Sequence, residues 1–340
     1  MSIFYENDPT NSNYWRSIIL YGKNVASYKF ALAKSLIELK SKNKNFISLE
    51  TLSEPFSKHL CEHLRTNEKQ ITSNSSTFLN TCKKFNNKEV TKEELLSVTT
   101  KIGFNNVIDA FHEVNGKTIK NKFFIDDRKI KKGITLTDNF FKLYELKESE
   151  NFFDEVESRW NLVETAWKLK ISPNLLNIDY DKSTGLLITK DNNKRITVTS
   201  SKNALNGYQK SKCFFCYDYI SIVSGSNNLS HVDHFFPHTL KSKNFNKYVD
   251  GIWNLVLACK TCNNGSKGKF AQLPSKNLLE RLFIRNEYYC GSHHPLRETI
   301  IKQTGNTKEL RKKFLQTCFN EAKKILIHTW EPEAKGNPKF

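Results

Sequence analysis

Two widely separated Cys-x-x-Cys pairs are the feature that most constrains the fold of this chain. The first pair is Cys213 and Cys216, and the second is Cys259 and Cys262. Each pair places two thiolates on one tight turn, which supplies half of a tetrahedral zinc site. Two pairs complete a site of four thiolates, and four protein ligands leave no position for water, so the zinc would be structural. The sequence predicts that zinc joins the two ends of the intervening segment and contributes to its folding.

The remaining cysteines and the absence of targeting signals bear on the compartment. Redox thiols or an iron–sulfur cluster are the alternatives to zinc for the paired cysteines. The start of the chain is acidic, and no stretch approaches the roughly 20 apolar residues needed to cross a bilayer. We therefore expect a cytoplasmic protein without a membrane partner, in which a disulfide framework is disfavoured. Buried thiols are the expected state of the four scattered cysteines, Cys61, Cys82, Cys290 and Cys318.

The charge balance is strongly basic. Lys and Arg number 53 against 35 Asp and Glu, which gives a formal net charge of +18. Such a balance favours partners that carry phosphates. However, Lys greatly outnumbers Arg and Asn is common, a mixture typical of AT-rich genomes. The charge alone therefore leaves a nucleic-acid partner undecided.

At 340 residues the chain is long enough for two domains. Residues 1–170 are predicted to form a mainly helical recognition or regulatory domain. Apolar residues recur at helical spacing, without an interior glycine, over Val25–Lys40 and Phe152–Leu169. Thr91 and Glu94 have the spacing of a capping box. Further helices are expected over 53–65 and 76–85, and a short strand over 123–125. The basic run over 128–132 is expected to be a solvated loop, with a binding site as the alternative.

The second half is expected to mix strands and helices. Residues 171–200 are predicted to form a β-hairpin connector that turns at Asp181–Gly185. Residues 201–330 would hold the zinc-clamped domain, which ends in helices over 275–288 and 308–327. We expect the tail from Glu331 to be frayed, because it contains two prolines and a glycine. The predicted fold class is therefore α+β.

The segment between the cysteine pairs carries groups suited to phosphodiester hydrolysis. Asp233 and His234 lie in a strand-like run that stops at Pro237. A neutral His can take a proton from water, and a carboxylate beside it can hold Mg²⁺. Neighbouring side chains on a regular strand point to opposite faces, so both serve one site only at a strand end or a distortion. Alone, such a pair is more often structural than catalytic.

The surrounding pattern changes that weighting. The order Cys-x-x-Cys, Asp-His-x-x-Pro, Asn-Leu-Val-Leu-x-Cys-x-x-Cys-Asn closely resembles the HNH endonucleases over about residues 205–275. The resemblance implies a ββα-metal finger, in which two short antiparallel strands precede a helix and zinc clamps the whole. It also implies that His234 is the general base that activates water. Asp233 and Asn263 would bind the catalytic Mg²⁺, for which Mn²⁺ is expected to substitute, while Asn254 orients a loop by hydrogen bonds.

One position departs from the family pattern. Many members carry Lys three residues after the final Asn, whereas this chain has Ser266 there. Lys267 and Lys269 are the nearby candidates for contact with phosphate. His238 is a candidate for contact with DNA or the metal, and a surface histidine is the alternative. We expect His293 and His294, and more weakly His231, to be structural.

The resemblance implies a Mg²⁺-dependent endonuclease that cuts double-stranded DNA and leaves 5′-phosphate and 3′-hydroxyl ends. The alternatives are a zinc-stabilised nucleic-acid-binding module without catalysis, or a nuclease directed at RNA. The region from Tyr14 to Leu39 loosely resembles prokaryotic HNH proteins of phage defence. That resemblance implies antiviral defence or restriction, and a protein partner in a larger complex. A simple DNA-docking scaffold is the plainer interpretation of residues 1–170.

Overall fold

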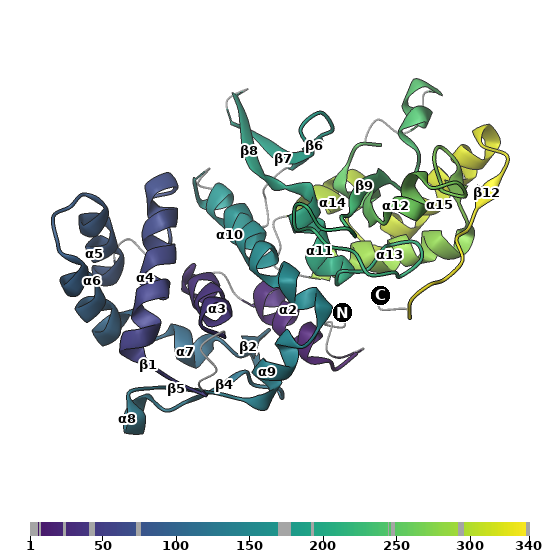
Figure 1. Ribbon diagram of the computed structural model, residues 1–340. Coiled ribbons are helices and arrows are strands. Elements are labelled where there is room, and N and C mark those ends of the chain that lie inside the picture. Colours follow the sequence, from purple (N-terminus) through teal and green to yellow (C-terminus); the bar gives the residue numbers. More distant parts are fainter. Residues whose placement is uncertain are drawn as a thin grey trace. The chain divides into compact units, whose positions relative to one another are not determined.

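The computed structural model describes residues 6, 8–22, 25–40, 45–72, 76–168, 178–191, 194–243, 245, 249–291 and 296–337. The chain divides into two compact units, an N-terminal unit of Phe4–Ser149 and a C-terminal unit that contains Glu150–Phe340 (Figure 1). Helices are combined with small sheets, which is consistent with the predicted α+β class. Across the described residues, no helix has both the length and the apolar run needed to cross a membrane.

The N-terminal unit is mainly helical. Its larger helices are α2 (Asn11–Tyr21), α3 (Tyr28–Leu39), α4 (Leu49–Thr66), α5 (Thr77–Asn86) and α6 (Lys92–Val98), and the π-helical turn η2 (Thr99–Gly103) extends α6. Its shorter helices are α7 (Val107–Ala110), α8 (Arg128–Lys131) and α9 (Asp138–Tyr144). Its strands are β1 (Phe46–Ser48), β2 (Glu113–Val114), β3 (Lys117–Thr118), β4 (Phe124–Asp126) and β5 (Gly133–Leu136), and the antiparallel sheet has the order β1-β5-β4.

Local sequence signals explain these helices. The side chains of Ser48 and Ser76 accept hydrogen bonds from the first turns of α4 and α5. The capping box is confirmed, because Thr91 and Glu94 bond reciprocally at the start of α6. α4 packs against α3, α5 and α6 (Figure 1), and the ring of Phe56, on α4, is fully buried. The unit therefore has a core of its own.

The predicted basic loop over 128–132 is exposed at residues 129–132, as expected, but differs at its start. Arg128 begins the single helical turn α8 and forms ion pairs with Asp109 and Asp126. It also donates to the backbone oxygen of Phe104, at 3.1 Å. The first residue of the basic run is therefore engaged within the unit and not held in solvent.

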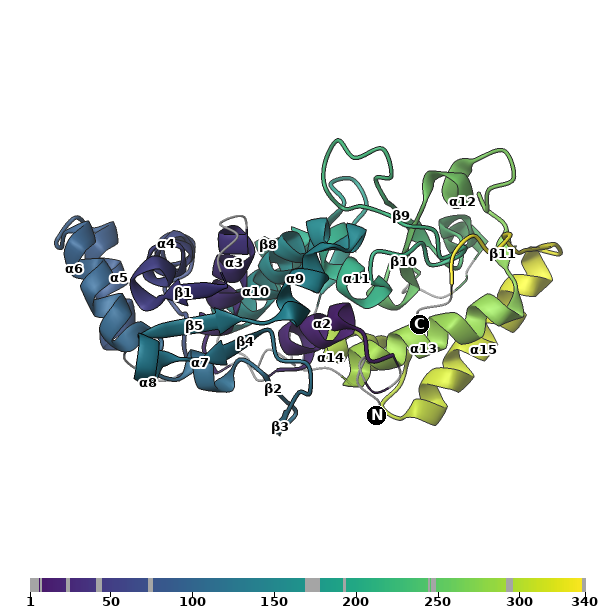
Figure 2. The ribbon, with the colours of Figure 1, turned by 60° about the horizontal axis from the view of Figure 1, so that its bottom comes forward.

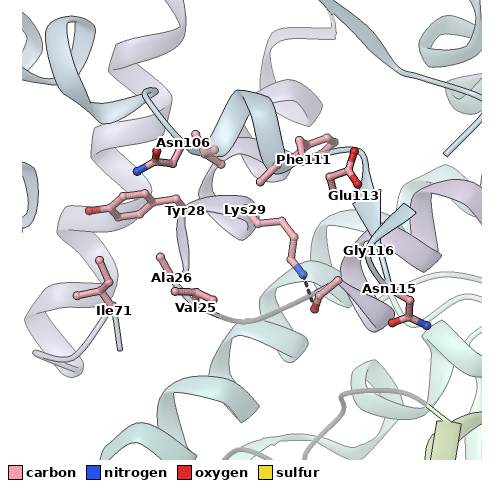
Figure 3. Close-up of a pocket in the computed structure, with 13 residues that line it drawn as sticks. Val25, Ala26, Tyr28, Lys29, Ile71, Asn106, Phe111, Glu113, Asn115 and Gly116 are labelled. Atoms are coloured by element: carbon pink, nitrogen blue, oxygen red, sulfur yellow. Dashed lines mark hydrogen bonds between the residues drawn. The ribbon is translucent and has the colours of Figure 1, made fainter. Parts of the chain in front are cut away.

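A cavity of about 460 Å³ lies in the N-terminal unit, beside α3, α7 and the turn between β2 and β3 (Figure 3). Its walls are mostly apolar and include Val25, Ile71 and Phe111. Lys29 also lines the cavity, and its Nζ donates to the backbone oxygen of Gly22, at 3.1 Å (Figure 3). Gly22 suits this place because a Cβ there would lie 2.7 Å from the backbone oxygen of Ile18 as well as 2.7 Å from the ammonium. The volume falls within the range of small-molecule sites.

The C-terminal unit alternates helices with short strands. Its helices are α10 (Phe152–Lys168), α11 (Ser201–Gln209), α12 (Lys260–Asn264), α13 (Lys276–Gly291), α14 (Leu296–Thr304) and α15 (Lys308–Ile325). Its strands are β6 (Asp179–Asp181), β7 (Leu186–Asp191), β8 (Lys194–Ser200), β9 (His231–His234), β10 (Leu255–Ala258), β11 (Leu273–Pro274) and β12 (Thr329–Trp330). The 3-10 turns are η3 (Lys147–Asn151) at its start, η5 (His238–Lys243) and η6 (Ile252–Asn254).

The division between the units differs from the predicted boundary near residue 170. α10 belongs to the C-terminal unit, where it packs against α11 and β8. Its apolar stripe is buried and consists of Val156, Trp160, Val163 and Trp167. The hairpin turn at Asp181–Gly185 joins β6 to β7 as expected, and β8 adds a third antiparallel strand. Because this sheet is packed on α10 and α11, it is part of the unit and more than a connector.

The C-terminal helices form a platform beneath the two strands β9 and β10. α13 packs against α14 and α15 (Figure 2). The fully buried Arg285 of α13 donates to the backbone oxygens of Leu255 and Trp253, at 2.7 and 3.0 Å. The start of α14 was not anticipated, and the preceding His293 and His294 lie outside the described residues.

β12, just before the tail, pairs in parallel with β11, and the indole of Trp330 donates to the backbone oxygen of Lys267, at 2.9 Å. The sequence predicts a frayed tail from Glu331, but two of its described residues are hydrogen-bonded to the unit. The amides of Lys335 and Gly336 both donate to the backbone oxygen of Cys216. Gly336 tolerates this approach because it has no side chain, since a Cβ there would lie 2.2 Å from the Tyr217 backbone oxygen. The segment therefore holds the first cysteine turn.

Candidate functional site

Two antiparallel strands and a following helix form the frame of the site. β9 pairs with β10 in a register that sets His234 opposite Leu255 and Asp233 opposite Val256. All four residues of β10 are fully buried, which fits their continuous apolar character. The buried side chain of Gln209 accepts a hydrogen bond from the Leu257 amide at 2.7 Å and donates one to the Leu257 backbone oxygen at 2.8 Å. These are the bonds that a neighbouring strand would otherwise make to β10. α12 follows β10 directly and packs against β9.

The four paired cysteines come together at one end of this frame. The sulfur atoms of Cys213, Cys216, Cys259 and Cys262 all lie within 4.8 Å of one another. Cys216 Sγ and Cys259 Sγ are 3.8 Å apart. Zinc–sulfur bonds of about 2.3 Å in a tetrahedron separate the sulfurs by about 3.8 Å. The cluster therefore has the ligand type, number and spacing to hold a zinc ion.

Surrounding groups fix the two cysteine turns. Backbone amides of Cys259 and Cys262 donate to the sulfurs of Cys213 and Cys259, at 3.3 and 3.4 Å. Such bonds favour the thiolate form that a metal requires. Arg281 donates to the backbone oxygens of Phe214 and Phe215, at 2.7 and 2.6 Å, within the first turn. The cluster is thus held by α13 and the tail as well as by its own turns.

His234 is the last residue of β9, so it lies at the strand end that a shared site requires. Its Nε2 is 3.1 Å from Oδ1 of Asp250. Burial lowers the pKa of His234 to about 4, against the opposing effect of Asp250. The imidazole is therefore neutral near pH 7, and its Nδ1 is the nitrogen that Asp250 does not occupy.

Asp250 connects several groups around His234. It lies 3.5 Å from His238 Nε2 and 2.7 Å from Lys241 Nζ. Burial alone would raise the pKa of Asp250, but Lys241 and His234 outweigh it and lower the value. The ring of Tyr180, from β6, packs edge-on against His234 with centroids 6.1 Å apart. Asp250 is thus an ionised carboxylate that fixes the orientation of the histidine.

Asp233 faces a different set of partners. Its Oδ2 lies 3.3 Å from Nζ of Lys269, whose side chain is fully buried. Burial raises the pKa of Asp233 and lowers that of Lys269, while each opposes the shift of the other. Among the described residues, Asp233 Oδ2 has no partner with hydrogen-bond geometry. This buried carboxylate oxygen faces the Lys269 ammonium, so a Mg²⁺ ion bound by Asp233 would have to displace or share that cation.

The remaining predicted site residues differ in how they are placed around Asp233 and His234. Asn263 lies inside α12, which begins at Lys260. Lys269 is buried against Asp233, which differs from the expected contact with phosphate, whereas Lys267 is exposed. His238 is partly exposed and faces Asp250. His231, on β9, is half-buried, and burial lowers its pKa.

Asn254 is fully buried and links the chain on both sides of the site. Its side-chain oxygen accepts from the Phe236 amide at 2.8 Å, and its amide donates to the backbone oxygens of Phe236 and Val249 at 3.0 and 2.7 Å. These bonds occupy both donors of the amide. The geometry fits a loop-orienting residue and not a metal ligand.

Replacement of Asn254 by Ala should therefore be costly. Three backbone groups would lose their partners in a buried place, and we expect the free energy of unfolding to fall by about 3 kcal/mol or more. Denaturant unfolding of the full chain measures the change. Asn264→Ala, at an exposed position of α12, is the matched control and should change stability by less than about 0.5 kcal/mol. Equal stabilities of the two variants would contradict the assigned role.

Sequence reasoning missed Asp250 and the pairing of Lys269. Asp250 lies 16 positions after its histidine partner and belongs to no local motif. Its one sequence signal is an acidic residue just before Gly251 and the strand-like run from Asn254. Comparison of the chain with protein-family models, curated proteins and solved structures gave no match. The functional inference therefore depends on the geometry of this site.

Proposed function

We propose that the chain is a Mg²⁺-dependent endonuclease of the HNH type that hydrolyses phosphodiester bonds in DNA. The observation that carries this proposal is the arrangement of β9, β10 and α12 around the cysteine cluster. The resemblance to the HNH motif would make Asp233 and Asn263 the metal ligands and His234 the general base. The net charge of +18 is consistent with a polyanionic substrate.

The proposed mechanism assigns one task to each polar group. Nδ1 of His234 takes a proton from the attacking water while Asp250 holds the ring through Nε2. Asp233 and Asn263 would hold Mg²⁺, which supplies stabilisation of the negative charge that develops on the phosphate. Asn254 keeps the backbone after β9 in place and so fixes the direction of His234.

The direct test is incubation of the purified chain with plasmid DNA and Mg²⁺. Conversion of supercoiled plasmid to nicked or linear forms, abolished by a chelator of divalent cations, is the expected result. Single-stranded DNA and RNA of matched sequence separate a DNA nuclease from an RNA-directed one. Inactivity on every substrate with Mg²⁺ and Mn²⁺ would reject the proposal for the isolated chain.

Asp250→Asn provides a test of the positioning role. The substitution keeps the size of the side chain but removes the charge that orients His234, so we expect kcat to fall about tenfold to a hundredfold with KM nearly unchanged. Asp250→Glu should recover part of the rate. Glu280→Gln is the control, because it removes the charge of an exposed carboxylate on α13, and it should leave the rate unchanged. Equal rates for Asp250→Asn and Glu280→Gln would exclude a role for this aspartate.

A non-catalytic nucleic-acid-binding module is the second candidate, and one observation favours it. The buried ammonium of Lys269 already neutralises Asp233, so the carboxylate does not need a metal for charge balance. This alternative predicts salt-dependent DNA binding without cleavage under any metal. It also predicts that His234→Ala leaves every measured property of the DNA complex unchanged.

A further inference from the structure

Phe270 is an aromatic side chain exposed beside the candidate site. The residue is 56% exposed. The other large hydrophobic side chains that are exposed among the described residues are all aliphatic. Other rings of the C-terminal unit, such as Phe214, Phe235 and Phe236, are fully buried. A single exposed hydrophobic side chain is common on protein surfaces, so exposure alone assigns Phe270 no role, and its backbone and neighbours carry the argument.

The backbone of Phe270 is also unusual. Its φ is +48°, in the left-handed region that favours glycine or asparagine and that a bulky residue rarely adopts. The chain on either side holds this conformation. The Lys269 amide donates to the backbone oxygen of Cys262 at 2.7 Å, and the Gln272 amide donates to that of Lys269 at 2.9 Å. A strained conformation that is fixed from both sides is typical of functional positions.

Phe270 is bonded directly to one candidate metal ligand, Asn263, and is linked to the other, Asp233, through Lys269. Its amide donates to the backbone oxygen of Asn263, at 3.2 Å. Its backbone oxygen accepts from Nζ of Lys269, the same ammonium that lies 3.3 Å from Asp233. The exposed ring is thus carried on a short, hydrogen-bonded segment whose other contacts are the groups expected to surround the scissile phosphate.

We propose that the ring of Phe270 stacks against a nucleobase next to the phosphate that is cut. This inference rests on the proposed nuclease function and names a substrate contact within it. Every base presents a π-face, so an aromatic side chain contacts DNA without selecting a sequence. The stacked base would cover the exposed ring, and the fixed backbone would set the distance from the base to the catalytic groups.

Phe270→Asn separates a substrate contact from a structural role. Asparagine tolerates the left-handed conformation, so the variant should keep or slightly raise the melting temperature of the protein. It has no aromatic ring, so KM for DNA cleavage, or Kd for DNA in an inactive His234→Ala background, should rise about tenfold. Phe270→Trp should keep the wild-type affinity because it retains a ring. Leu310→Asn, at an exposed position of α15, is the control and should leave DNA affinity unchanged.

The possible results separate a failure of the stacking contact from a failure of the nuclease function. If the wild-type protein cuts DNA and Phe270→Asn has the same KM and Kd, the stacking contact is overturned and the nuclease function stands. If both Phe270→Asn and Phe270→Trp lower the melting temperature and weaken DNA binding equally, the ring is structural and the contact is likewise overturned. If the wild-type protein neither binds nor cuts nucleic acid, the proposed function falls and the contact falls with it.

Discussion

His234→Ala is expected to reduce DNA cleavage by about a hundredfold to ten-thousandfold, because the imidazole is the proposed acceptor of the water proton. Cysteine ligation of zinc should be unaffected, since His234 lies at the far end of β9 from Ala258 and the second cysteine turn. Single-turnover cleavage at saturating protein measures the chemical step without the contribution of binding.

Two controls make this result specific. His234 is buried, so its removal leaves a space, and His234→Gln refills that space without a group able to act as the base. Both variants should lose cleavage while DNA affinity stays within about threefold of wild type. Added imidazole should restore part of the rate to His234→Ala and none to His234→Gln. A variant that cuts DNA at the wild-type rate would remove His234 from the mechanism.

Cys259→Ser is expected to have the largest effect on stability. Structural zinc sites contribute on the order of 10–16 kcal/mol of apparent binding free energy, and that energy is coupled to folding. Loss of one thiolate should reduce the zinc content from about one ion per chain to nearly none. The cooperative thermal transition of the C-terminal unit should then disappear, because β10 ends just before this residue and α12 begins just after it.

Cys318→Ala is the matched control for that experiment. Cys318 is buried on α15 and lies outside both Cys-x-x-Cys motifs, so its replacement should retain full zinc content. Zinc content by elemental analysis and thermal melts measured on the same samples give the comparison. Full zinc occupancy in Cys259→Ser, or loss of zinc from Cys318→Ala, would contradict the assigned ligand set.

The sequence was most informative where a short motif contains its own partners. The cysteine turns, the capping box at Thr91 and the hairpin turn at Asp181 each depend on residues a few positions apart, and the structure contains all three arrangements. The predicted burial of the four scattered cysteines is also confirmed. In these cases the local spacing determines the geometry.

Prediction failed where a partner is distant along the chain. The periodicity of α10 predicts a helix with one apolar face, but it does not state which unit that face contacts. The composition of the tail is typical of a frayed end, yet Lys335 and Gly336 bond the backbone oxygen of Cys216, far earlier in the chain. Asp250 and Lys269 likewise acquire their partners through the pairing of β9 with β10 and the turn after α12, which no local pattern specifies.

The two cysteine pairs lie on either side of the candidate site in the sequence, so a cut within the site would leave one pair on each fragment. Cys216 and Cys259 lie 43 positions apart, and Asp233, His234 and Asp250 all lie within the loop that a shared zinc ion would close. A single backbone cut between Pro237 and Asp250 would separate the proposed base from the carboxylate that orients it. Each fragment would still carry one cysteine pair. Zinc would then act as the connector of a split protein, and its concentration would set how often the two halves of the site meet.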